Sequence, residues 1–83
     1  MMSKVERVLE FLASQERNEI GQAWTTGKEI QDGTEIIPAD INDAIEIAEN
    51  RGLVEVLKTL GTAPFKFHSV SITGEGRLWL ESH

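Results

Sequence analysis

The sequence predicts a small domain of the α+β class, in which three helical stretches come before a β-hairpin and a last helix. Two observations carry this prediction. The stretch from Ile36 to Val54 has the spacing of a helix that passes directly into a strand, and two later runs, 53–57 and 65–72, resemble the strands of a hairpin. The chain has 83 residues, of which 40% are hydrophobic, so we expect one domain, residues 1–83, with one core.

The first predicted helix runs from Ser3 to about Glu16. Ser3 followed by Glu6 has the spacing of a capping box, in which each side chain bonds the backbone of the other residue. The apolar residues at helical spacing form one stripe: Val5, Val8, Leu9 and Leu12. After a polar connector, Trp24-Thr25 is predicted to form a short first strand.

The second predicted helix is short, from Gly27 to about Gln31, with Thr26 as its N-cap. Asp32-Gly33-Thr34 consists of residues typical of turns, so we expect the helix to end before it. Ile36 is predicted to anchor the turn into the next helix, whereas Ile37 has no evident place in the core.

The third predicted helix begins near Pro38, which suits a first turn because its missing N–H would have no helical partner there. Its inward stripe repeats at i, i+3, i+4 and i+7: Ile41, Ala44, Ile45 and Ala48. Arg51 ends the helix, and Gly52 suits the left-handed conformation that follows a helix end.

The hairpin strands are predicted at Leu53–Leu57 and Phe65–Ile72, with the residues between them as its tip. Thr73 is predicted to cap a last helix, from Gly74 to about Glu81. In that helix we expect Leu78 to pack inward.

Composition narrows the classes of function. The chain has no cysteine, which excludes disulfides and thiol chemistry. No run approaches the roughly 18 apolar residues of a membrane span, and charges interrupt the N-terminal stretch where a signal peptide would be apolar, so we expect a cytoplasmic protein without membrane contact. Without a glycine-rich phosphate loop or paired metal-ligand spacing, we expect no enzyme activity, no cofactor and no metal.

Two short motifs point to a known family. The third predicted helix ends in Arg51-Gly52-Leu53-Val54, and the last begins after Ile72-Thr73-Gly74-Glu75-Gly76. In this order and spacing the chain resembles winged helix-turn-helix domains, in which a helix ends in R-G-L-[IV] and the last helix opens with L-T-x-x-G; Ile72 stands here for the leucine. The resemblance covers nearly the whole chain and implies a three-helix core, a β-hairpin wing and a short C-terminal helix.

The same resemblance implies a DNA-binding, transcription-related regulator. The third helix would enter the major groove of double-stranded DNA, the wing would lie on the backbone, and a homodimer would read two half-sites. Carried over to this sequence, the expected DNA contacts are Thr26, Lys28, Asn42, Lys58, Thr62 and Lys66.

The charge pattern favours a different function. The net charge is −6, and seven acidic residues between positions 29 and 49 follow one another without a basic residue. Asp43 and Glu46 stand where DNA-binding relatives often carry basic or neutral polar residues, and carboxylates facing phosphates oppose binding. The alternative is a protein–protein interaction or dimerisation module that does not bind DNA. Its expected interface consists of Ile37, Asp43, Glu46, Ile47 and Trp79.

Overall fold

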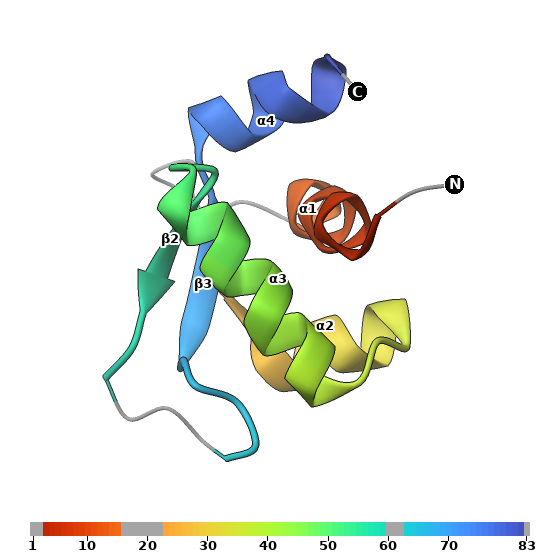
Figure 1. Cartoon of the computed structure of the whole chain (residues 1–83), viewed down its shortest axis with the longest axis vertical. Coiled ribbons are helices and arrows are strands. Elements are labelled where there is room, and N and C mark those ends of the chain that lie inside the picture. Colours follow the sequence, from red (N-terminus) through yellow and green to blue (C-terminus); the bar gives the residue numbers. More distant parts are fainter. Residues whose placement is uncertain (1–2, 16–22, 60–62, 83) are drawn as a thin grey trace.

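The computed structural model describes residues 3–15, 23–59 and 63–82. They form a small α+β domain with four helices and a three-stranded antiparallel sheet (Figure 1). In chain order the elements are α1 (Lys4–Ser14), β1 (Thr25–Thr26), α2 (Gly27–Thr34), α3 (Pro38–Asn50), β2 (Val54–Leu57), β3 (Ser69–Ile72) and α4 (Gly74–Glu81). None of these helices is long and apolar enough to span a membrane.

The sheet has the order β1-β3-β2, with β3 in the centre and antiparallel to both neighbours. Thr25 pairs with Val70, and Val54 pairs with Ile72. The two long-range pairings place α2, which follows β1 directly, beside the hairpin. β1 is therefore one edge strand of the sheet and β2 is the other. Because α2 begins directly after β1, the start of α2 lies close to the residues that precede β3.

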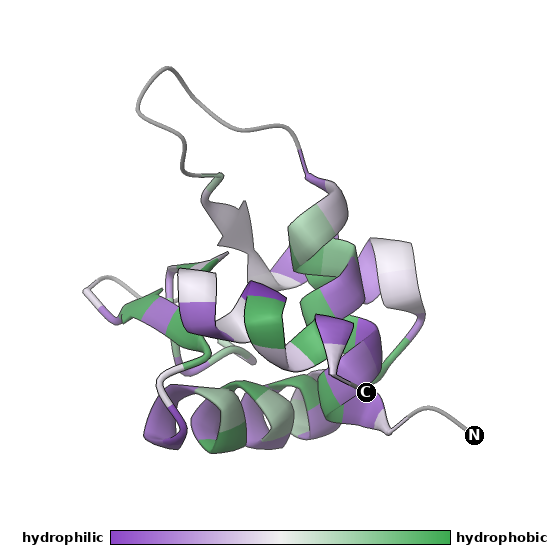
Figure 2. Ribbon diagram, turned by 90° about the horizontal axis from the view of Figure 1, so that it is seen from above, coloured by the Kyte–Doolittle hydropathy of each residue, from purple (hydrophilic) through white to green (hydrophobic). Residues whose placement is uncertain are grey.

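The core lies where α1, α2 and α3 meet the central strand. α1 contacts α2, α3, α4 and β3, and it lies between α2 and α4 (Figure 1). The largest fully buried side chains come from all of these layers and include Leu9, Leu12, Ile30, Ile41 and Val70. Figure 2 shows hydrophobic and hydrophilic residues interspersed along the helices, as expected when one side of a helix packs inward and the other faces solvent.

α2 is longer than predicted, so the expected turn at Asp32-Gly33-Thr34 is wrong. The helix continues because Thr34 Oγ1 donates a hydrogen bond to the carbonyl of Ile30 (2.7 Å), and Arg7 Nη2 donates to the carbonyl of Thr34 (2.6 Å). The left-handed turn falls on Glu35 instead, at φ 62°. The helix end is therefore held from outside, by a side chain of α1.

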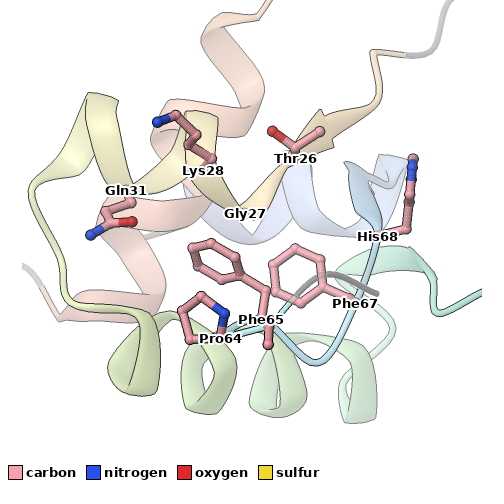
Figure 3. Close-up of a pocket in the computed structure, with 9 residues that line it drawn as sticks. Thr26, Gly27, Lys28, Gln31, Pro64, Phe65, Phe67 and His68 are labelled. Atoms are coloured by element: carbon pink, nitrogen blue, oxygen red, sulfur yellow. The ribbon is translucent and has the colours of Figure 1, made fainter. Parts of the chain in front are cut away.

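The second hairpin strand is shorter than predicted, since only Ser69–Ile72 of the expected Phe65–Ile72 pair in the sheet. Asn42 explains the difference. Its side chain binds the backbone of Pro64 and Lys66, so these groups pair with α3 rather than with β2. The segment 63–68 consequently runs between α2 and α3 (Figure 3), and it rejoins the sheet at its last residue, where the N–H of His68 donates to the carbonyl of Leu57 in β2 (2.7 Å).

α4 has the predicted bounds, but the prediction that Leu78 packs inward is wrong. Leu78 is 58% exposed, whereas Trp79 and Leu80 are half-buried and pack against the core. Gly76 is buried against the carbonyl of Leu53. Residues three and four positions later share its side of the helix, so Trp79 and Leu80 face the core and Leu78 does not.

Candidate functional site

The outer side of α3 is the most acidic surface that the described residues form on one helix. Its inner side is buried as predicted, through Ile41, Ala44, Ile45 and Ala48. Asp43 and Glu46 lie one turn apart on the outer side, and both are exposed. Neither has an ion-pair partner among residues 3–15, 23–59 and 63–82. Both charges therefore remain available to a ligand or partner.

Two further acidic residues of α3 are already paired. Lys4 Nζ lies 2.5 Å from Asp40 Oδ2, and Lys58 Nζ lies 3.0 Å from Glu49 Oε1. The first pair joins α3 to the start of α1, and the second joins it to the segment after β2. These pairs reduce the charge at the two ends of α3 and leave Asp43 and Glu46 as the carboxylates of α3 without an ion-pair contact in the described residues.

Asn42, an expected DNA contact, serves the fold. Its Nδ2 donates a hydrogen bond to the carbonyl of Pro64 (3.0 Å), and its Oδ1 accepts one from the N–H of Lys66 (3.0 Å). The amide thus has a backbone donor and a backbone acceptor from the segment 63–68. An asparagine that reads adenine needs both ends of its amide for the base edge, so DNA reading would require these two bonds to break.

The other expected DNA contacts are spread over different surroundings. Thr26 forms the capping box of α2 with Glu29, whose Oε1 accepts from the Thr26 N–H (3.1 Å). Lys28 is exposed on α2. Lys58 and Lys66 line one hollow together with Glu46 and Glu49, so the basic residues there face acidic ones. Thr62 lies outside the described residues.

The expected protein interface is brought together only in part. Ile47 is 42% exposed and shares a pocket of about 260 Å³ with Asp43 and with Val5 of α1. Ile37 is 60% exposed at the opposite end of α3, and Trp79 is half-buried on α4. The structure therefore groups Asp43, Glu46 and Ile47 on α3, which we name the acidic face. It gives Trp79 a place in the core instead.

The structure also contains a second candidate site, which was not predicted from the sequence. A pocket of about 400 Å³ lies between the start of α2 and the segment 63–68 (Figure 3). Phe65 and Phe67 form its wall, with ring centroids 5.9 Å apart and planes inclined by 56°. Gly27 makes the close approach of Phe65 possible, because an added Cβ would overlap the ring. Residues so far apart in the chain give no local signal that they meet.

No protein-family model, curated protein or solved structure matches this chain. The candidate functions therefore depend on the geometry and charge of its own residues.

Proposed function

We propose that this chain is a winged-helix interaction module that binds a basic partner protein through the acidic face of α3. The observation that carries the proposal is the pair of exposed carboxylates, Asp43 and Glu46, which have no ion-pair partner in the described parts of the chain. Ile47 lies beside them and offers apolar area to the same partner. An apolar centre with a charged rim is the composition expected of a protein interface.

The winged-helix part of the proposal is supported by the order of the elements. A helix, a short strand, two helices, a hairpin and a last helix follow one another, and the sheet has the order β1-β3-β2. The motif residues occupy matching places: Arg51-Gly52 ends α3, and Thr73 caps α4. A module of this kind presents α3 to its partner, which is the helix that carries the acidic face.

Charge favours a protein partner over DNA. At about 7 Å in water a carboxylate and a phosphate repel each other by roughly 0.6 kcal/mol, and a carboxylate and a lysine attract each other by the same amount. Asp43 and Glu46 both act in this direction, and Asn42, the one residue of α3 expected to read a base, is held by the segment 63–68. The same helix therefore disfavours phosphate and favours a basic surface.

The test uses a basic helical peptide in which one leucine is flanked by lysines at positions i−4 and i+4. We expect amide shifts in ¹⁵N-NMR spectra to concentrate at residues 40–50 on titration. Asp43→Asn with Glu46→Gln should weaken binding roughly two- to thirtyfold, because each exposed ion pair contributes about 0.2–1 kcal/mol.

The matched control is Asp32→Asn with Glu81→Gln, which removes the same charge from exposed positions on α2 and α4. We expect it to retain the affinity of the unaltered chain. An equal loss in both double variants would mean that the peptide senses only net charge, and the acidic face would no longer be the binding site.

DNA binding is the second candidate, because Lys28 and Lys66 are exposed and have no ion-pair partner in the described parts of the chain. Fluorescence anisotropy with random-sequence duplex DNA, at about 50 mM and about 200 mM salt, separates the two functions. We expect no salt-dependent binding. Micromolar binding that falls steeply between the two salt concentrations would instead support a DNA-binding regulator.

A further inference from the structure

We propose that Lys58, which follows β2, competes with the basic partner for the acidic surface of α3. This inference rests on the proposed function and adds a way in which the same chain limits that binding. Lys58 Nζ lies 3.0 Å from Glu49 Oε1, so one carboxylate of α3 is already bound by a lysine of its own chain. A basic partner that reaches Glu49 must therefore displace Lys58.

Glu49 extends the acidic face by one helical turn. Asp43, Glu46 and Glu49 are spaced three residues apart on α3, so each lies about one turn from the next. Of these three carboxylates, only that of Glu49 has an ion-pair partner among residues 3–15, 23–59 and 63–82. A partner helix that covers two turns of α3 would therefore find Asp43 and Glu46 unpaired and Glu49 occupied.

The backbone beside Lys58 is held close to α3 by hydrogen bonds. Asn42 binds the backbone of the segment 63–68 with both ends of its side-chain amide. The N–H of His68, at the end of this segment, donates to the carbonyl of Leu57, which precedes Lys58 (2.7 Å). When the Lys58 side chain leaves its carboxylate, it therefore stays near α3. A group tethered close to its partner competes at a high effective concentration, on the order of millimolar for short flexible connections.

The ion pair is open enough to exchange partners. A hollow of about 390 Å³ lies between α3 and the hairpin, and its lining includes Glu46, Glu49, Lys58 and Lys66. The side chain of Lys58 is 65% exposed and that of Glu49 is 34% exposed. Exposed ion pairs contribute little to stability, so a lysine of the partner can replace Lys58 while the hairpin remains folded. Lys58 thus lowers the affinity of α3 for a basic partner without blocking it.

The test compares the basic helical peptide with a longer one that carries further lysines at positions i−8 and i+8, so that it reaches Glu49 in either direction. We expect Lys58→Gln to strengthen binding of the longer peptide about two- to fivefold, as for one exposed ion pair, and to change binding of the shorter peptide less. In a Glu49→Gln background this gain should vanish, because the carboxylate for which the two lysines compete is gone. The longer peptide should also shift the amides of residues 57–59 in ¹⁵N-NMR spectra.

Lys28→Gln is the matched control, because it removes the same charge from an exposed position on α2. We expect it to leave the affinity for both peptides nearly unchanged. An equal effect of Lys58→Gln and Lys28→Gln, with peptide shifts at residues 40–50, would overturn competition by Lys58 and leave the proposed function standing. Absence of binding by every variant would overturn both. Binding of the longer peptide by Lys58→Gln alone would support the competition.

Discussion

At the scale of single residues, two glycines in α4 have opposite surroundings. Gly76 is buried, and a Cβ added there would overlap the backbone carbonyl oxygen of Leu53. Gly74 has nothing within 4 Å of the same added atom. The chain thus needs a glycine at position 76 because backbone cannot move aside cheaply, whereas position 74 has room for a side chain.

We expect Gly76→Ala to lower the free energy of unfolding by about 1–3 kcal/mol, the usual cost of overpacking. Gly74→Ala is the matched control and should raise the stability by roughly 0.4–1 kcal/mol, because alanine reduces the freedom of the unfolded chain. Urea denaturation of both variants measures the difference. Equal midpoints for the two variants would contradict the close contact between α4 and Leu53.

At the scale of elements, Thr73 joins α4 to the turn between α3 and β2. Its Oγ1 accepts a hydrogen bond from the N–H of Gly76 (3.0 Å) and donates one to the carbonyl of Gly52 (2.8 Å). Its own N–H donates to the carbonyl of Leu53 (3.0 Å). The residue therefore caps α4 and also attaches it to the turn between α3 and β2. The Ser3 hydroxyl bonds only within the first turn of α1: it accepts from the N–H of Glu6 (3.1 Å) and donates to the Glu6 carboxylate (3.5 Å).

Thr73→Ala should consequently cost more stability than Ser3→Ala. Loss of an N-cap bond costs about 1 kcal/mol, and loss of a second hydrogen bond adds about 0.5–1.5 kcal/mol. We expect roughly 1.5–2.5 kcal/mol for Thr73→Ala and about 1 kcal/mol for Ser3→Ala, measured by thermal or urea unfolding. Thr73→Ser keeps the hydroxyl and should recover most of the loss; failure to recover it would assign the effect to the methyl group.

At the scale of the whole molecule, variants of the neighbours Leu78 and Trp79 can distinguish packing within one chain from association of two chains. Trp79 is half-buried against the core, and Leu78 is 58% exposed on the other side of α4. Truncation of Trp79 removes packing within one chain, whereas truncation of Leu78 removes apolar area that only a second molecule can cover. The homodimer stays a prediction, and this pair of residues tests whether α4 forms it.

We expect Trp79→Ala to lower Tm by roughly 5–15 °C, which corresponds to about 1–3 kcal/mol in a domain of this size. Its mass in analytical ultracentrifugation should equal that of the unaltered chain. Leu78→Ala should leave Tm within about 3 °C. A lower mass for Leu78→Ala would place a dimer interface on α4, whereas a lower mass for Trp79→Ala would contradict its assignment to the core.

Most helix boundaries could be predicted from the sequence because their signals are local. The hydroxyl groups of Ser3, Thr26 and Thr73 each bond an N–H three residues later, as their positions predicted. Pro38 begins α3, and Gly52 has the expected positive φ, 72°. The stripes of α1 and α3 are buried as their spacing requires, because a helix with 3.6 residues per turn places such residues on one side.

The sequence by itself therefore determined the α+β class, the order of the elements and the acidic character of α3. Tertiary structure decided the length of α2, which depends on Arg7 bonding a residue 27 positions away, and the path of segment 63–68, which depends on Asn42 bonding residues 22 and 24 positions away. It also assembled the aromatic pocket. Contacts between residues so far apart do not produce a local sequence pattern, because they form only after the helices have packed together.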